Sequence, residues 1–226
     1  MALIRNNSLA DTPLSPLPPL HLREHVLPMG SRTYLVGILN VTPDSFSDGG
    51  KYLHPEAACR HLEELTAGGV DIVDIGGEST RPGAAAVSME EELCRLRPVL
   101  EAWAACKRNA ILSIDTSKSE VAEAALSYGA SLVNDVTALH GDLRMAEVVA
   151  RHQAGLVLMH MKGEPRTMQE NPTYDNLIDE IKFCFEKGIA EAVRAGVREE
   201  SILLDPGIGF GKTVTHNLEI LRNLKK

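Results

Sequence analysis

The most regular feature of the chain is a series of short apolar runs, each of which stops at a polar residue or a glycine. Six such runs occupy residues 34–39, 71–75, 110–114, 131–133, 155–159 and 201–204. They are followed by Asn40, Gly76, Asp115, Asn134, His160 and Asp205. Runs of Val, Ile and Leu with little alternation are typical of strands that are covered on both faces, so this pattern predicts parallel strands.

Helical patterns with recognisable ends separate these runs. Pro55 suits the first turn of a helix and Gly68 its C-terminal cap, while Gly129 and Gly196 are expected to end two further helices. Two Ser-x-x-Glu sequences, at 88–91 and 117–120, predict capping boxes. Alternating strands and helices form either a doubly wound sheet or a (β/α)8 barrel, and in both the site lies at the carboxyl ends of the strands.

The chain holds fewer units than the eight that a closed barrel needs. About six strand–helix units are present, and Lys226 falls inside an apparent helix. The doubly wound sheet and the barrel therefore both stay open, and as a barrel the chain would be incomplete at the C-terminus, with residues 21–226 as its single domain. Residues 1–20 are rich in proline and are expected to form a flexible leader, followed at 21–34 by a short hairpin that turns near Pro28 and Gly30.

Charge and composition exclude several classes of protein. The net charge of −8 argues against nucleic acid or an anionic membrane as a partner. No apolar run approaches the ~18 residues of a membrane span. None of the four cysteines belongs to a Cys-x-x-Cys pair, which favours a reduced, cytoplasmic protein over a disulfide or zinc framework.

The polar residues at the strand ends are the strongest candidates for a site. Asn40, Asp115, Asn134 and Asp205 can accept hydrogen bonds from a flat edge rich in donors, such as that of a pterin or a guanine. The alternative for each residue alone is a helix N-cap. Met159 offers a soft apolar wall to a ring, and His160 is expected to serve packing or substrate contact rather than a metal.

Two glycine-containing loops follow strands 2 and 6. Residues 205–213 resemble a phosphate-binding loop, but Pro206 stands where that loop needs glycine, so a P-loop is rejected. We expect the glycines to let the backbone approach a flat ligand, with Lys212 as a cation near it. In the loop at 76–83, Arg81 is a candidate anion clamp, with an ordinary surface arginine as the alternative.

Six segments together resemble the dihydropteroate synthase family of the bacterial folate pathway. They are 37–50 (GILNVTPDSFSDGG), 71–84 (DIVDIGGESTRPGA), 113–118 (SIDTSK), 133–136 (VNDV), 156–169 (LVLMHMKGEPRTMQ) and 203–213 (LLDPGIGFGKT). Their order and spacing are similar to the family along residues 33–226. The resemblance implies an α/β fold of the pterin-binding (β/α)8 TIM barrel type, with only about six of its strand–helix units present in this chain. It also implies a transferase that joins 6-hydroxymethyl-7,8-dihydropterin diphosphate to p-aminobenzoate and is a target of sulfonamides.

The resemblance also implies roles for individual residues. Asp115, Asn134, Met159, Asp205 and Lys212 would bind the pterin, and Asn40 would supply one oxygen to Mg2+ on the diphosphate. The loop residues Ser45, Phe46, Thr80, Arg81 and Pro82 would close over the diphosphate and p-aminobenzoate. Asp115 would stabilise a cation at the methylene carbon, with Asn40, Thr80 and Arg81 acting on the leaving group.

Members of this family continue through two more strand–helix units, which this sequence does not contain. Those units supply a Ser-Arg-Lys-Ser lysine, an Arg-x-His anion clamp and the helices of a homodimer interface. Two alternatives therefore stay open beside the synthase: an inactive truncated fragment, and a pterin-binding methyltransferase domain. The loops at 42–46 and 80–82 favour the synthase, because a methyltransferase has no need of them.

Overall fold

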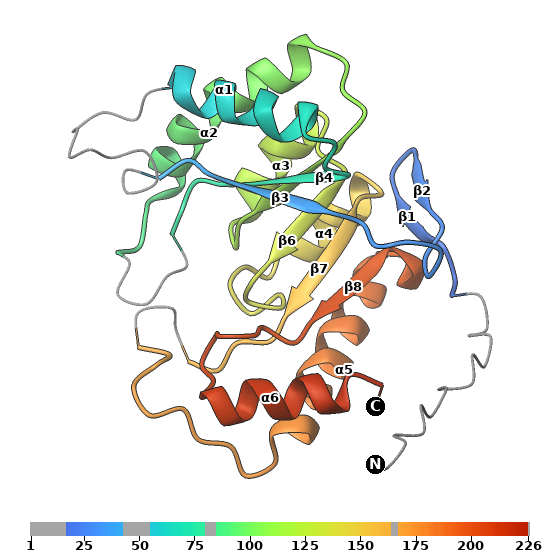
Figure 1. Cartoon of the computed structure of the whole chain (residues 1–226), viewed down its shortest axis with the longest axis vertical. Coiled ribbons are helices and arrows are strands. Elements are labelled where there is room, and N and C mark those ends of the chain that lie inside the picture. Colours follow the sequence, from blue (N-terminus) through green and yellow to red (C-terminus); the bar gives the residue numbers. More distant parts are fainter. Residues whose placement is uncertain (1–16, 43–54, 80–84, 164–166, 226) are drawn as a thin grey trace, which may run out of the picture.

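A computed structural model describes residues 17–42, 55–79, 85–163 and 167–225 (Figure 1). All six predicted strands are confirmed. They are β3 (Val36–Asn40), β4 (Ile72–Gly76), β5 (Ile111–Asp115), β6 (Leu132–Asp135), β7 (Gly155–Met159) and β8 (Ile202–Asp205). The helices are α1 (Pro55–Ala67), α2 (Met89–Ala105), α3 (Ser119–Ser127), α4 (Met145–Arg151), α5 (Leu177–Ala195) and α6 (Val214–Asn223), with a 3-10 turn at Glu199–Ser201. A small hairpin, β1 (Leu20–Leu22) and β2 (His25–Leu27), precedes them.

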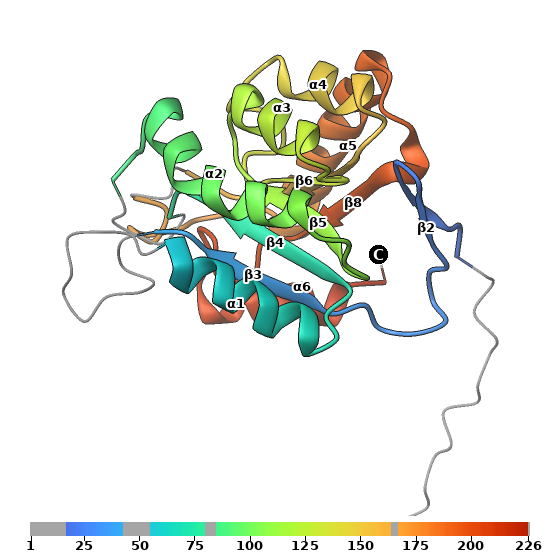
Figure 2. The ribbon, with the colours of Figure 1, turned by 90° about the horizontal axis from the view of Figure 1, so that it is seen from above.

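The six strands form one parallel sheet in the order of the chain, β3-β4-β5-β6-β7-β8. Successive helices pack side by side along the outer surface of this curved sheet (Figure 2). A doubly wound sheet reverses its strand order at a switch point, and this sheet has no reversal. The expected α/β barrel architecture is therefore confirmed, with six parallel strands present. Among the described residues, β3 and β8 each pair with one neighbouring strand only.

Residues of each strand point alternately to the helices and to the inside of the curve, as pleated strands require. Outward side chains such as Val73, Ile75, Leu112 and Ile114 are fully or almost fully buried and form the main core against the helices. Inward side chains at the start of β4, β5 and β6 form a second, smaller apolar cluster together with side chains of β1. Its buried members are Leu20, Leu22, Ile72, Ile111 and Leu132.

The hairpin β1–β2 closes the end of the sheet at which the strands begin (Figure 1). A hairpin in this region was predicted, but its turn lies at Arg23 and Glu24, so the turn expected near Pro28 and Gly30 is wrong. Arg23 adopts a left-handed backbone with φ 53°. Its guanidinium donates to the carbonyl oxygens of Leu126 and Ala130, at 2.9 and 2.8 Å. Distant contacts therefore select this turn over the local preference of Pro and Gly.

Helix ends match the sequence expectations in part. Ser88 caps α2 by accepting from the amide of Glu91, and Gly196 ends α5 in a left-handed conformation. The predicted box at Ser117 is wrong, because α3 begins after Lys118 and the Asp142 carboxylate accepts from the amide of Ser119 instead. After α1, Gly69 rather than Gly68 takes the positive φ, 82°. Among the described residues, no helix is long and apolar enough to cross a membrane.

Candidate active site at the strand ends

The register of the sheet brings the predicted polar residues into one row. Asn40 pairs with Gly76, Gly76 with Asp115, and Asp115 with Asn134. On neighbouring strands of equal register, paired residues face the same side, so all of these side chains point to the inside of the curve. Gly76 has no side chain, and this leaves space between Asn40 and Asp115.

A pocket of about 260 Å3 lies above this row. Five residues predicted from the sequence line it: Asn40, Asp115, Asn134, Met159 and Asp205. The other lining residues are Ile38, Thr42, Asp74, Ser79, Val136 and Phe210. A pocket with apolar walls and a few convergent polar groups is the usual form of a small-molecule site.

Among the polar lining residues that were not predicted as site residues, Thr42 and Ser79 fall in the two loops already singled out, whereas Asp74 was missed altogether. It lies inside an apolar run, two residues before Gly76, and only 8% of its surface is exposed. Alternation along β4 could have revealed it, since Asp74 shares its face with Gly76 at the end of the strand.

Carboxylates dominate the electrostatics of the pocket. Burial raises the pKa of Asp115 well above its ordinary value, and the nearby charge of Asp74 raises it further. Burial likewise raises the pKa of Asp74. Glu78 and Glu92 add to the effect on Asp115, and both pair with the ammonium group of Lys118. The pocket therefore favours a ligand that donates hydrogen bonds or carries positive charge.

The same geometry decides between a shared site and simple helix caps. Asp115 does not cap α3, whose N-cap is Lys118. Asp205 accepts from the amide of Gly207 at 2.8 Å through Oδ1 and so orders the turn that follows β8. Both residues nevertheless line the same pocket, so each of them is placed to contribute to a shared site.

The glycine loop after β8 approaches another part of the backbone rather than an open surface. Gly207, Gly209 and Gly211 have φ values of 66°, 88° and 63°. A side chain at Gly207 or Gly211 would collide with the carbonyl oxygen of His160 or Lys162 respectively. The glycines thus let the loop pack on the segment that follows β7.

Lys212 joins these two segments and does not line the pocket. Its side chain is 3% exposed, and Nζ donates to the carbonyl oxygens of His160 and Phe210 at 3.0 and 2.9 Å. Burial lowers the pKa of Lys212 to about 8. The sequence could not show this, because a lysine beside glycines and an aspartate fits a ligand contact equally well.

His160 is buried at the end of β7, next to Tyr174. Burial, together with the charge of Lys212, lowers its pKa to about 4. No cluster of three His, Cys, Asp or Glu residues able to hold a metal occurs in the described part of the chain. His160 is thus a neutral ring packed in the protein.

The oxygens beside Gly76 offer a place for a hard cation with few protein ligands. A Cβ atom at Gly76 would lie 3.5 Å from Oδ1 of Asn40 and 3.5 Å from Oδ2 of Asp115. Mg2+ prefers such oxygen ligands and usually keeps several waters or phosphate oxygens besides one or two protein groups. The residues present therefore fit Mg2+ held through Asn40. Ser45, Phe46, Thr80, Arg81 and Pro82 lie outside the described residues.

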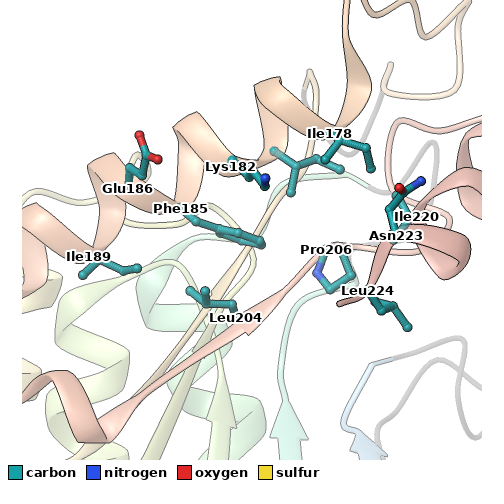
Figure 3. Close-up of a pocket in the computed structure, with 11 residues that line it drawn as sticks. Ile178, Lys182, Phe185, Glu186, Ile189, Leu204, Pro206, Ile220, Asn223 and Leu224 are labelled. Carbon is teal, nitrogen blue, oxygen red and sulfur yellow. The ribbon is translucent and has the colours of Figure 1, made fainter. Parts of the chain in front are cut away.

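A larger hollow of about 510 Å3 lies on the other side of β8, between α5 and α6 (Figure 3). Phe185, Ile189 and Leu204 face it, with Lys182 and Glu186 also on its wall. Its wall is mostly aliphatic, and none of the predicted polar residues at the strand ends lines it. The smaller polar pocket is therefore the candidate site.

Comparisons with known proteins point to one family. The family described as pterin binding enzyme matches residues 36–226. The dihydropteroate synthase of Synechocystis sp. is 44% identical over 207 residues, which are 92% of this chain and 71% of that protein. The dihydropteroate synthase of Escherichia coli K12 is 46% identical over 194 residues, which are 86% of this chain and 68% of that protein.

Solved structures give the same result. Dihydropteroate synthase of Yersinia pestis, in a sulfonamide drug complex, superposes with a TM-score of 0.83 at 44% identity, over 91% of this chain and 74% of that one. Dihydropteroate synthase of Xanthomonas albilineans with 4-aminobenzoic acid gives a TM-score of 0.81 at 43% identity, over 92% and 72%. The sequence and the fold of this chain are thus both similar to those of dihydropteroate synthases along nearly the whole described chain.

Proposed function

Because the chain belongs to the pterin-binding enzyme family, we propose that it catalyses the dihydropteroate synthase reaction. In this reaction 6-hydroxymethyl-7,8-dihydropterin diphosphate and p-aminobenzoate give 7,8-dihydropteroate and diphosphate. The relatives at 44% and 46% identity are dihydropteroate synthases, which favours this activity over a methyltransferase. The observation that carries the proposal is the row Asn40–Gly76–Asp115–Asn134 on the floor of one pocket with Asp205 and Met159.

The pocket suits the pterin ring in shape and charge. The amino group and ring N–H of a pterin are parallel donors, which a carboxylate such as Asp205 can accept together. Asn134 and Asp115 offer further acceptors, and Met159 provides the apolar wall. Lys212, the other residue assigned to pterin binding, would contribute by holding the carbonyl groups of His160 and Phe210 in place.

The reaction exchanges a C–O bond at the pterin methylene carbon for a C–N bond. Diphosphate leaves with the bonding electrons, and positive charge develops on the methylene carbon and the ring. Carboxylates fixed in a pocket with little water stabilise such charge more than water does, and Asp115 is the residue proposed for this role. The aniline nitrogen then attacks and loses a proton, a step that depends mainly on positioning.

Mg2+, held through Asn40, would neutralise the diphosphate and make it a better leaving group. We propose that Thr80 and Arg81 contact the diphosphate and that Ser45, Phe46 and Pro82 belong to the p-aminobenzoate side. The acidic field around Asp115 and Asp74 opposes an anion, which is why the diphosphate requires a cation or Arg81 near it.

Compartment and assembly are also proposals. The four cysteines Cys59, Cys94, Cys106 and Cys184 are free thiols, which supports a reducing compartment, the cytoplasm. The family resemblance implies a homodimer for full-length members only, and sedimentation of the purified chain would reveal its own oligomeric state.

The first test is incorporation of radiolabelled p-aminobenzoate into dihydropteroate by the purified chain, with pterin diphosphate and Mg2+. Product should form, and it should disappear when Mg2+ is chelated. Asp205→Asn should weaken pterin binding by about 1.5–3 kcal/mol, because an amide NH2 then faces ligand donors. Asp175→Asn, at an exposed position before α5, is the matched control and should leave turnover unchanged. Absence of product from the unaltered chain would contradict the proposed function.

A further inference from the structure

Asp74 takes no part in the roles assigned above, yet it is one of the most buried carboxylates of the pocket. It is 8% exposed, on the inner face of β4, between the apolar cluster at the start of the strands and the row that contains Gly76. Ser113, which pairs with it on β5, places its buried hydroxyl beside this carboxylate. A buried carboxylate is costly, so its presence here calls for a function.

Asp74 contacts the row through the side-chain amide of Asn134. Nδ2 of Asn134 donates to Oδ2 of Asp74 at 2.9 Å. The hydrogen bonds of Asn134 and Ser113 favour the ionised form of Asp74. An ionised carboxylate accepts hydrogen bonds and does not donate them, so the NH2 end of the amide must turn toward Asp74. The oxygen of the amide must then turn away from it.

That oxygen is available to a ligand. Oδ1 of Asn134 is buried and has no partner in the described part of the protein, although Asn134 lines the pocket. Leaving a buried acceptor without a donor is unfavourable, so a ligand that brings an N–H group to it gains the corresponding free energy. An amide turned the other way would present its NH2 group and would instead prefer a ligand carbonyl.

We propose that Asp74 is a positioning residue that fixes the orientation of the Asn134 amide and thereby makes the pocket prefer a 2-amino ring, a pterin, over its 2-oxo counterpart, a lumazine. This inference rests on the proposed function and adds the residue that sets part of its selectivity. Asp205 contributes its own preference for donors, so removal of Asp74 reduces the selectivity without abolishing it.

The test compares the binding of 6-hydroxymethylpterin and 6-hydroxymethyllumazine to the full chain by calorimetry. The isosteric variant Asp74→Asn can either accept from or donate to Asn134, so the amide loses its fixed orientation. The pterin-to-lumazine affinity ratio should fall about 3- to 10-fold, the value of one neutral hydrogen bond. If Asp74 had a purely structural role, the substitution would lower the affinity for both ligands equally and leave the ratio unchanged.

A double variant, Asp74→Asn with Asn134→Asp, exchanges the two groups. The carboxylate at position 134 can only accept, and the amide at position 74 can donate to it, so the preference for the pterin should return. If Asp74 contacts the ligand directly, the exchange does not restore the ratio. Because the double variant keeps the hydrogen bond and the volume, it is compared directly with the unaltered chain even if Asp74→Asn alone fails to fold.

Asp135→Asn is the matched control. Asp135 is a fully buried carboxylate of β6 whose oxygens accept from Thr137 and Leu139, and it does not line the pocket. This variant should lower the melting temperature and keep the affinity ratio. If the unaltered chain prefers the pterin and the affinity ratio of Asp74→Asn lies within twofold of that of the unaltered chain, the role of Asp74 alone is overturned. An unaltered chain that binds neither ring overturns the proposed function as well.

Discussion

His160 lies at the end of β7, beside Met159, and only 5% of its surface is exposed. Three charged groups influence the protonation of its ring: Lys212 and Lys162 disfavour it, and Glu180 favours it. Burial is the largest influence, and the pKa of the ring falls from 6.5 to about 4. The folded protein therefore holds a neutral imidazole where the unfolded chain would hold a charged one in mild acid.

Stability should depend on pH in the window set by this histidine. Above about pH 6.5 the ring is neutral in both states, and its contribution to the free energy of unfolding is fully present. As the pH falls toward 4, the unfolded state takes up a proton first and up to about 3 kcal/mol is lost. Urea unfolding between pH 7 and 4 would measure the loss. His160→Asn should flatten the profile, and an unchanged slope in this variant would contradict the assignment.

At the residue scale, the sequence could predict those polar side chains that stand where an apolar run stops. Asn40, Asp115, Asn134 and Asp205 all stand at such positions, and all four line one pocket. The sequence analysis did not predict Asp74, because this residue lies inside an apolar run and only its burial in the folded structure identifies it. Lys212 was predicted as a site residue, but its contacts were not, because its carbonyl partners, His160 and Phe210, are fixed by the packing of two loops.

At the scale of elements, the segment between β8 and α6 shows how glycines can serve one loop for different reasons. Both Gly209 and Gly211 have a positive φ. No described atom lies within 4 Å of the place that a Cβ atom would take at Gly209, whereas at Gly211 the carbonyl oxygen of Lys162 is in the way. Gly209 is required by backbone conformation alone. Gly211 is required by conformation and by close approach.

These two glycines form a matched pair for mutation. Gly209→Ala should cost about 1–2 kcal/mol, because a residue with a Cβ atom is strained in a left-handed conformation. Gly211→Ala should cost about 3 kcal/mol or more, because the loop must also move away from the segment after β7. Chemical denaturation of both variants would measure the difference. Equal losses would show that the close approach has no energetic weight.

The sequence predicted the type of each main element better than its contacts. Strands and helices were recognisable from apolar runs and caps, since these signals are local. The hairpin turn at Arg23 was not, because the carbonyl groups of Leu126 and Ala130, more than 100 residues away in the chain, stabilise it. The predicted cap of α3 was wrong for the same reason, because the carboxylate of Asp142, rather than Ser117, accepts from the amide of Ser119 in the first turn.

At the scale of the whole molecule, the order of the strands follows from their connections, because short right-handed crossovers place successive parallel strands side by side. The described sheet has four strands with two neighbours each, β4 to β7, and two strands with one neighbour, β3 and β8. Val36 and Ile38 of β3 are 53% and 63% exposed, in contrast to the buried residues of β4. Protection should therefore decrease from the centre of the sheet to its edges.

Hydrogen exchange of the backbone amides would test this gradient. Amides of β5 and β6 should exchange slowest, through global unfolding, and those of β3 and β8 should exchange faster, through local opening. Strand lengths are the same in the two groups, five and four residues against five and four, so length does not explain a difference. Uniform protection across all six strands would contradict the gradient.

The hairpin at the start of the described chain has a consequence for the order of events during synthesis. Leu20 and Leu22 pack on side chains from β4, β5 and β6, and the amide of Arg23 donates to the carbonyl oxygen of Gln153. A ribosome delivers the hairpin before any of these partners exists. The apolar side chains of the hairpin therefore stay unprotected until Gln153 and the strands before it have been synthesised, and a chaperone that shields nascent apolar segments would find a binding site here.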